Sequence, residues 1–173
     1  MPCLLTLAAV SALARGLPTA TAWTRFGAVN GVVVDSGGAG LVEQFLNVPY
    51  ALPPVNNLRF ADTVGWSTRF AGGSFNATRL GVQCPQDDGS GGMVGDEDCL
   101  YLSVWAAAGR GAFGGGSPQP LPVLVWLHGG NFVSGNGDQY DAPLLAAKHG
   151  VVVVAANYRL SHLGWLQPVR GLA

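Results

Sequence analysis

Charged side chains are scarce in this chain of 173 residues: 9 Lys and Arg stand against 10 Asp and Glu, a formal net charge of −1. Because only 11% of the residues are charged, the chain has no basic surface that could neutralise a phosphate backbone, and we expect no nucleic-acid partner. Long apolar runs are lacking too, since none reaches the roughly 18 residues that a membrane span needs. We therefore expect no membrane span.

Apolar residues and glycine are abundant. The hydrophobic fraction of 49% is sufficient for a core and argues against intrinsic disorder. The 26 glycines and 11 prolines indicate a chain that turns often. Composition therefore favours a folded domain with many loops.

The N-terminus has the pattern of a secretory signal. Residues 3–14 (CLLTLAAVSALA) form an apolar stretch of suitable length, and Ala12 and Ala14 are the small residues that a signal peptidase reads. Ala20 and Ala22 form a second such pair. We expect a signal peptide within residues 1–22, cleaved near position 14 or 22, and a domain over residues 23–173 of a secreted protein. A buried helix at the start of the domain is the alternative.

The expected pairing of the three cysteines depends on the signal peptide. Cys3 lies in the expected signal, which leaves Cys84 and Cys99 on either side of a loop rich in Gly and Asp. In an oxidising compartment such a pair predicts a disulfide. Two cysteines without a third ligand at metal-binding spacing do not predict a metal site. Asn76-Ala77-Thr78 is an N-glycosylation acceptor, which agrees with export.

The hydrophobic pattern predicts an α/β protein. Two apolar runs have no polar face, as expected for strands of a parallel sheet that is buried on both sides. Between them, Asp141 can cap a helix that ends at Gly150. The glycine-rich segment 109–120 is expected to be a flexible connection. The predicted elements are a hairpin of Val29–Val34 and Leu41–Val48, a strand at Leu100–Trp105, strands at Val123–Leu127 and Val151–Ala155, and a helix over 142–148.

The loop after Val123–Leu127 is the strongest candidate for a site. Loops that leave the C-terminal end of a buried parallel strand lie where such sheets bind ligands. Gly129 and Gly130 allow a close backbone approach, and successive N–H groups there can bind one negatively charged oxygen, as in an oxyanion hole. Neither G-x-G-x-x-G nor Gly-Lys-Ser/Thr is present to favour a phosphate. On these residues alone, a tight structural turn is equally compatible.

Six segments occur in an order that resembles a known family. They are FLNVPYALPP (45–54), LRF (58–60), CPQ (84–86), EDCLYLSV (97–104), PVLVWLHGGNF (122–132) and NYRL (157–160). This series is similar to the carboxylesterase type B (cholinesterase-like) family of α/β-hydrolases. Two positions depart from the family pattern: Ser103 stands where Asn is usual, and Asn131 where Gly is usual.

The resemblance implies a fold and roles for particular residues. The fold is the N-terminal portion of an α/β-hydrolase, a β-hairpin followed by a mostly parallel sheet with a βαβ unit. Gly130 and Asn131 supply oxyanion-hole N–H groups, supported by Gly129. The family's first disulfide falls on Cys84 and Cys99, and its structural ion pair on Arg59 and Glu97. No cofactor is implied.

The catalytic triad is absent from these 173 residues. No serine has glycine at both −2 and +2, and the family's acid and histidine lie still further along the chain. His128, His149 and His162 do not match that histidine. We therefore expect a secreted carboxylic-ester hydrolase of the serine esterase family, represented by an incomplete chain that is inactive alone and acts on a small ester in the full-length protein.

Two alternatives remain at this point. One is a non-catalytic extracellular adhesion or binding protein, because the same fold serves recognition as well as catalysis. The other is a short protein that pairs with a longer homologue through an exposed sheet edge, which we expect at Val151–Ala155. The sequence does not indicate an oligomeric state or a particular substrate.

Overall fold

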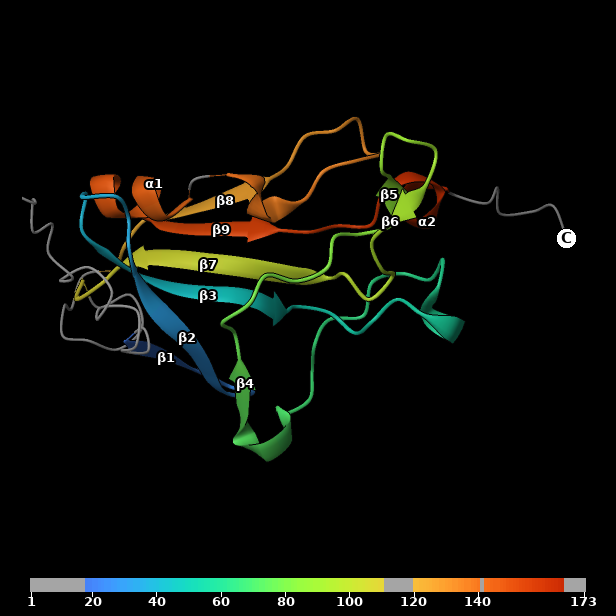
Figure 1. The fold of residues 1–173 in the computed structure, drawn as a ribbon. Coiled ribbons are helices and arrows are strands. Elements are labelled where there is room, and N and C mark those ends of the chain that lie inside the picture. The colour runs from blue at the N-terminus through green and yellow to red at the C-terminus, as the bar shows by residue number, and fades with distance from the viewer. Residues whose placement is uncertain (1–17, 111–119, 141, 167–173) are drawn as a thin grey trace, which may run out of the picture.

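The computed structural model describes residues 18–110, 120–140 and 142–166. A twisted sheet runs through this part of the chain, with a helix over one face (Figure 1). The strands are β1 (Thr19–Thr24), β2 (Gly27–Asp35), β3 (Leu41–Pro49), β4 (Ser74–Asn76), β5 (Gln86–Asp87), β6 (Met93–Val94), β7 (Tyr101–Ala107), β8 (Val123–Leu127) and β9 (Val152–Ala156). The helical elements are η1 (Asn56–Leu58), η2 (Ala71–Gly73), η3 (Gly137–Gln139), α1 (Ala142–His149) and α2 (Ser161–Trp165).

The main sheet has the order β1-β2-β3-β7-β9-β8, with β4 beside β2. Neighbouring strands in this sheet are antiparallel, apart from the parallel pairs β8–β9 and β2–β4. The expectation of a mostly parallel sheet is thus correct for the βαβ unit β8-α1-β9, and the sheet as a whole is mixed. Short turns join the antiparallel strands β1, β2 and β3, whereas the parallel pair β8–β9 is joined by the longer crossover through α1.

The predicted N-terminal hairpin is confirmed. β2 and β3 pair in antiparallel register, with Val34 opposite Val42. The Asp35 carboxylate stabilises the turn by accepting hydrogen bonds from the amides of Gly37 and Gly38, each at 3.0 Å. β1 was not predicted from the sequence, and it overlaps the second of the two possible cleavage positions.

The predicted helix is confirmed as α1. Gly150 ends it with a left-handed backbone (φ 63°), and its N–H donates to the carbonyl of Ala146 at 3.0 Å. The expected cap, Asp141, lies outside the described residues. Residues 1–17 of the expected signal peptide and residues 111–119 of the glycine-rich connection also lie outside them.

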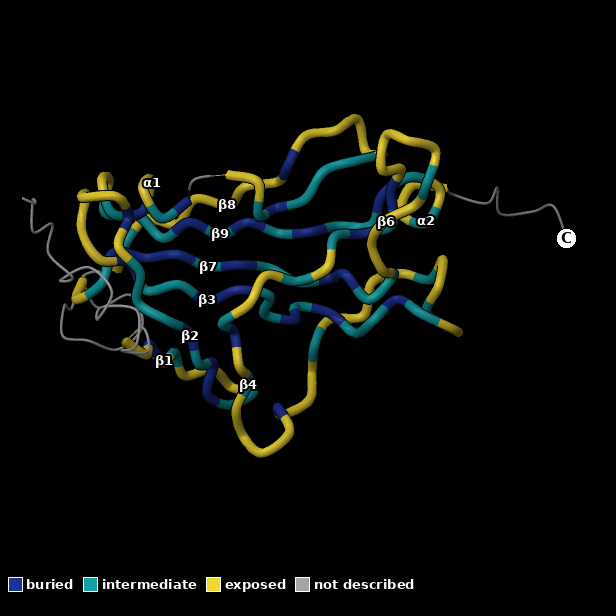
Figure 2. The backbone as a smooth tube through the Cα atoms, viewed as in Figure 1, coloured by how far each residue is buried: buried dark blue, intermediate teal, exposed yellow. Residues whose placement is uncertain are grey.

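The prediction that Val123–Leu127 is buried is wrong for the described structure. All five residues of β8 are exposed, from 39% at Trp126 to 64% at Leu127 (Figure 2). β8 forms an edge of the sheet, and α1 packs against β7, β3 and β9. The expected bare edge at Val151–Ala155 is also wrong, because β9 lies between β7 and β8 and buries Val153 and Ala155.

The sheet carries apolar clusters on both faces. Alternation along β3 directs Val42 and Leu46 toward α1 and Phe45 toward the opposite cluster, as the two-residue period of a strand requires. On the α1 side, Trp105 is buried and donates its indole N–H to the Gln44 side chain at 2.9 Å. A third cluster surrounds Cys84 and Cys99, next to the loops at one end of the sheet. These clusters hold the loops that follow β8 and β9 against a rigid sheet.

Candidate functional site

The glycine loop, residues 128–136, begins where β8 ends. Gly130 (φ 124°), Asn131 (φ 52°) and Phe132 (φ 62°) are three successive residues with positive φ. At Gly130 only glycine fits, since a Cβ atom would lie 1.9 Å from the Ser134 carbonyl oxygen. Asn is the residue other than glycine that tolerates a left-handed backbone best, so position 131 keeps this turn without glycine.

Several backbone amides of this loop are unpaired in the described part of the chain, and those of Gly130 and Asn131 are among them. Within the turn, the Gly130 carbonyl accepts hydrogen bonds from Val133 N at 3.0 Å and Ser134 N at 3.1 Å. Among the described residues, none accepts a hydrogen bond from the N–H of Gly130 or Asn131. Both residues are exposed. The amides on either side of this pair are also unpaired and exposed, so the loop presents successive donors that a ligand oxygen can reach. The two amides predicted from the sequence as oxyanion donors are among them, and their role stays a prediction.

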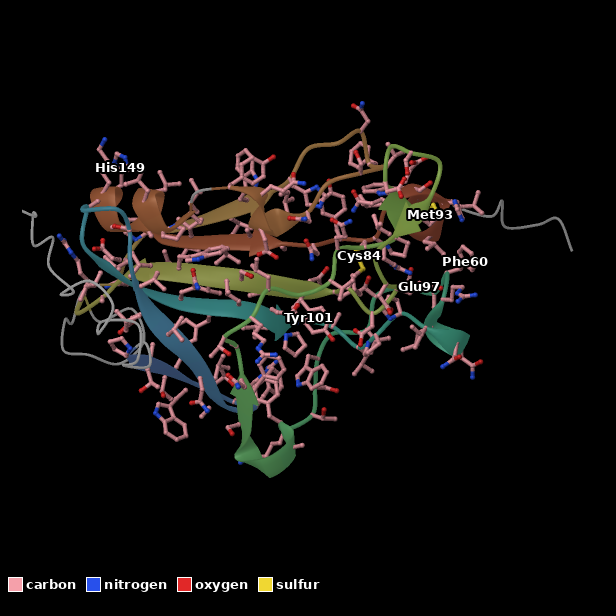
Figure 3. The ribbon with its side chains drawn as sticks, in the orientation of Figure 1. Phe60, Cys84, Met93, Glu97, Tyr101 and His149 are labelled. Atoms are coloured by element: carbon pink, nitrogen blue, oxygen red, sulfur yellow. A yellow bond between two sulfur atoms is a disulfide. The ribbon has the colours of Figure 1, made fainter. Side chains whose placement is uncertain are left out.

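His128 is held inside the structure. It is only 3% exposed, and its ring stacks on Tyr158 with ring centroids 4.3 Å apart. The Tyr158 hydroxyl donates to the His128 carbonyl at 2.6 Å. His128 thus packs the base of the loop against the segment that follows β9. His149 ends α1, at the opposite end of the molecule from Cys84 and Glu97 (Figure 3).

An open cavity of about 500 Å³ adjoins the glycine loop. Leu127, His128 and Phe132 contribute to its wall from the β8 side, and Tyr158 and Trp165 from the segment after β9. The rings of Phe132 and Trp165 lie 4.3 Å apart between centroids. Much of the wall is aromatic or aliphatic, although Arg159 and Thr63 line it too. Together with the free backbone donors, such a wall suits a small molecule that carries both a hydrocarbon part and a carbonyl.

The predicted disulfide joins Cys84 and Cys99. Both residues are almost fully buried in the cluster at the loop end of the sheet. The two segments that the disulfide ties together also carry CPQ and EDCLYLSV, which bracket the loop 87–96. The disulfide thus fixes the start of β5 and the approach to β7 next to each other.

Arg59 and Glu97 form an ion pair with two hydrogen bonds. Arg59 Nε donates to Glu97 Oε2 at 2.7 Å, and Arg59 Nη2 contacts Glu97 Oε1. The hydrogen bond to Glu97 raises the pKa of the Arg59 guanidinium, which keeps it charged. The pair links the loop after β3 to the disulfide segment.

Asn76 lies on β4, away from the glycine loop (Figure 1). It is exposed at the end of this short strand. Its exposure leaves the side chain accessible to a glycosyltransferase in a secretory compartment.

A polar group joins β7 to η3, and its member Asp138 lies in none of the sequence motifs. The Ser103 hydroxyl on β7 donates to Asp138 Oδ1 at 2.9 Å and accepts from the Asn47 N–H at 3.2 Å. Burial raises the pKa of the Asp138 carboxyl, and the hydrogen bond from Ser103 acts in the opposite direction. Next to Asp138, the Gly137 N–H donates to Asn157 Oδ1 at 2.8 Å. These bonds fasten η3 to the sheet.

Over residues 18–110, 120–140 and 142–166, no group of three His, Cys, Asp or Glu side chains is arranged to hold a metal ion. In the same residues, no helix has the length and apolar character needed to cross a bilayer.

Fold and loop together define an α/β-hydrolase arrangement: a mixed sheet, a βαβ unit, and free amides after the first strand of that unit. The sequence profile described as "Carboxylesterase family" matches residues 18–170. The chain belongs to the carboxylesterase family, as the sequence resemblance predicted.

Individual relatives agree with this assignment. The chain is 39% identical over 146 residues to a fumonisin B1 esterase of Sphingopyxis macrogoltabida, covering 83% of this chain and 25% of the relative. It is 36% identical over 158 residues to an acetylcholinesterase of Gallus gallus, covering 83% and 20%. The solved structure of a PNB esterase superposes with a TM-score of 0.70 at 33% identity, covering 86% of this chain and 29% of that one. The chain thus spans about a quarter of the length of these relatives.

Proposed function

We propose that this chain forms the N-terminal part of a secreted serine carboxylic-ester hydrolase and that Gly130 and Asn131 donate the oxyanion-hole hydrogen bonds. The observation that carries the proposal is that the amides of Gly130 and Asn131 are unpaired and exposed, beside a largely apolar cavity at the end of β8. Membership of the carboxylesterase family supports ester hydrolysis as the chemistry.

The two amides act on the charge that develops during acyl transfer. A serine hydroxyl bonds to the ester carbonyl carbon, its proton passes to a histidine, and the carbonyl oxygen takes the negative charge. The N–H groups of Gly130 and Asn131 stabilise that oxygen, and collapse of the intermediate expels the alcohol, which takes the proton from the histidine. Losing one such donor typically costs roughly 2.7–4 kcal/mol of transition-state stabilisation.

The 173 residues do not contain the serine of this scheme, because none of their serines lies in a G-x-S-x-G segment. We therefore expect the 173-residue chain alone to hydrolyse p-nitrophenyl acetate no faster than buffer containing a heat-denatured sample. Turnover that a serine-directed phosphonate abolishes would contradict this expectation.

A transcript-level experiment tests the function itself. The coding sequence downstream of Ala173 is read for an in-frame G-E-S-x-G, and any longer product is expressed and assayed with p-nitrophenyl esters. A product that carries this serine and turns over ester supports the hydrolase. A long product that lacks the serine, and is inactive, overturns it.

The second outcome would favour a binding protein. Asn131 is the specific observation for this candidate, since it places an exposed polar residue at a position where the family pattern has glycine. Such a side chain narrows the approach to the two amides and offers a hydrogen-bonding group to a bound partner. Retention of an immobilised extracellular protein by the inactive long product would support this candidate.

Export is part of the proposal. Cleavage near Ala14 leaves β1 (Thr19–Thr24) whole, whereas cleavage after Ala22 removes most of it, including the buried Ala20. We therefore propose cleavage near Ala14 and glycosylation of Asn76. Material secreted from a eukaryotic host should begin near Arg15 and should migrate faster after glycosidase treatment. Asn76→Gln should remove that shift, and a protein retained in the cell with Met1 intact would contradict the proposal.

A further inference from the structure

The glycine loop closes on itself at Gly135. This residue has positive φ (110°), and a Cβ atom on it would lie 2.5 Å from His128 Nδ1 and 2.6 Å from the Gly129 carbonyl oxygen. One residue earlier, Ser134 donates its N–H to the Gly130 carbonyl at 3.1 Å. The second half of the loop is thus in direct contact with the first half. We therefore expect a displacement of Gly135 to disturb Gly129 directly and Gly130 through Ser134.

Gln86 holds Gly135 with two hydrogen bonds. The Gly135 N–H donates to Gln86 Oε1 at 2.8 Å, and Gln86 Nε2 donates to the Gly135 carbonyl at 3.0 Å. The same Nε2 also donates to the Cys84 carbonyl at 3.1 Å. Since Gln86 is only 7% exposed, the three bonds satisfy a side-chain amide that water hardly reaches.

Gln86 is itself fixed by the disulfide. It lies on β5, two residues after Cys84, whose bond to Cys99 ties this segment to the approach to β7. Figure 3 shows Cys84 at the loop end of the sheet, next to the β5–β6 hairpin labelled in Figure 1. A continuous series of contacts therefore runs from the disulfide through Gln86 to Gly135, and from there to the backbone of Gly129 and Gly130.

We propose that Gln86 is a positioning residue for the backbone amides of Gly130 and Asn131. The inference rests on the proposed function for what those amides do, because it assigns to Gln86 only the placing of the loop that carries them. Gln86 contacts no residue that would react. It acts through Gly135.

Amide exchange tests the inference on the 173-residue chain without any enzymatic assay. In Gln86→Glu, the carboxylate still accepts from Gly135 N–H but no longer donates to the carbonyl oxygens of Gly135 and Cys84, which it repels. At pH 7.5 we expect protection factors at Gly135, and also at Val133 and Ser134, to fall by about tenfold or more. At about pH 4.5, protonation of the introduced carboxylate restores one donor, and the protection should return toward that of the wild type.

The response of Val133 and Ser134 decides the outcome, because their amides report the position of the Gly130 carbonyl. If only Gly135 loses protection, Gln86 merely fastens its own neighbour and the proposal is overturned. Gln44→Glu is the matched control: Gln44 is half-buried and accepts one hydrogen bond from Trp105, far from the loop, so the loop should be unaffected.

A second variant keeps the test decisive if Gln86→Glu unfolds the chain, which loss of protection in β7 and β9 would reveal. Gln86→Met has a similar shape and no charge, and it removes both hydrogen bonds to Gly135. It should free the same three amides at every pH. Unchanged protection in this variant would overturn the inference, whereas the absence of a downstream serine would overturn only the proposed function.

Discussion

Gly129 and Gly130 are neighbours in the sequence and differ in what surrounds them. A Cβ atom on Gly129 would meet nothing within 4 Å, whereas one on Gly130 would lie 1.9 Å from the Ser134 carbonyl oxygen, at φ 124°. The family motif contains both glycines, but only the second is required by the backbone of this loop. The backbone at position 130 thus explains why the motif has glycine there, whereas nothing steric requires glycine at position 129.

This difference predicts opposite responses to the same substitution. Gly130→Ala should lower the free energy of unfolding by about 1–3 kcal/mol, because an L-residue is strained at this φ and the Ser134 carbonyl must move. For a chain of this length, that corresponds to a fall in Tm of roughly 3–10 °C. Gly129→Ala, measured beside it by differential scanning fluorimetry, should stay within about 1 °C of wild type. Equal effects of the two variants would contradict the described loop.

Asp138 makes stability depend on pH. Burial raises the pKa of this carboxyl, so around its titration the folded chain binds more protons than the unfolded chain, and stability falls as the pH rises. The contribution is fully present below the pKa of an unfolded Asp and is lost above the raised pKa of the folded state.

Asp138→Asn should therefore stabilise the chain at pH 7, while keeping an oxygen that accepts from Ser103. The gain should be below about 1 kcal/mol, because the carboxyl is partly solvated. Urea unfolding of variant and wild type should show the gain at pH 7 and its disappearance near about pH 3.5. The exposed Asp62→Asn removes the same charge and serves as the control against which the gain is measured. A variant that is less stable at pH 7 would refute this assignment.

At the scale of elements, the disulfide Cys84–Cys99 connects β5 to the approach to β7. It closes a loop of 15 residues, which is worth about 3 kcal/mol in the chain-entropy description. The double variant Cys84→Ser/Cys99→Ser should lose stability by this order in urea unfolding. It should also loosen Gln86, so the amides of the glycine loop should exchange faster than those of the β2–β3 hairpin. Equal changes in both places would show that the disulfide acts on the whole domain only.

Elements with local sequence signals were predicted correctly, and some long-range contacts were not. The β2–β3 hairpin and α1 were predictable because their signals are local: the turn at Asp35, the two-residue alternation, and the glycine that ends the helix. The loop at 128–132 was found by its glycines and by the family motif. The contacts of Gln86 with Gly135 and of Asp138 with Ser103 were not predicted, because the partners lie 49 and 35 residues apart in the sequence. No local pattern marks a contact of that kind.

The exposure of β8 illustrates a different limit. An apolar run such as Val123–Leu127 indicates that the strand prefers to be covered, but it does not identify the element that covers it. In the described residues, α1 covers β7, β3 and β9, and β8 is left at the edge. The prediction placed the edge at the neighbouring strand because it expected the partner strands of Val151–Ala155 to lie in a part of the family fold that these 173 residues do not contain. The order β7-β9-β8 places the later strand inside.

At the scale of the whole molecule, the described part of the chain presents one long apolar edge. β8 exposes five consecutive hydrophobic residues along the border of the sheet, as the exposed strand near the top of Figure 2 shows. Exposed apolar edges pair with other chains, and natural proteins protect such edges with charge. We therefore expect the isolated chain to self-associate at micromolar concentrations through β8.

Val125→Lys tests this expectation, because Val125 lies in the middle of the edge and is 63% exposed. A lysine there should repel a second copy and shift the chain from large species toward monomer in sedimentation velocity, without a change in Tm beyond about 2 °C. Leu80→Lys is the matched control, since Leu80 is 60% exposed on a loop away from the sheet edge. If both variants improve the monomer fraction equally, general surface hydrophobicity causes the association. If neither does, the edge at β8 is not the contact between copies.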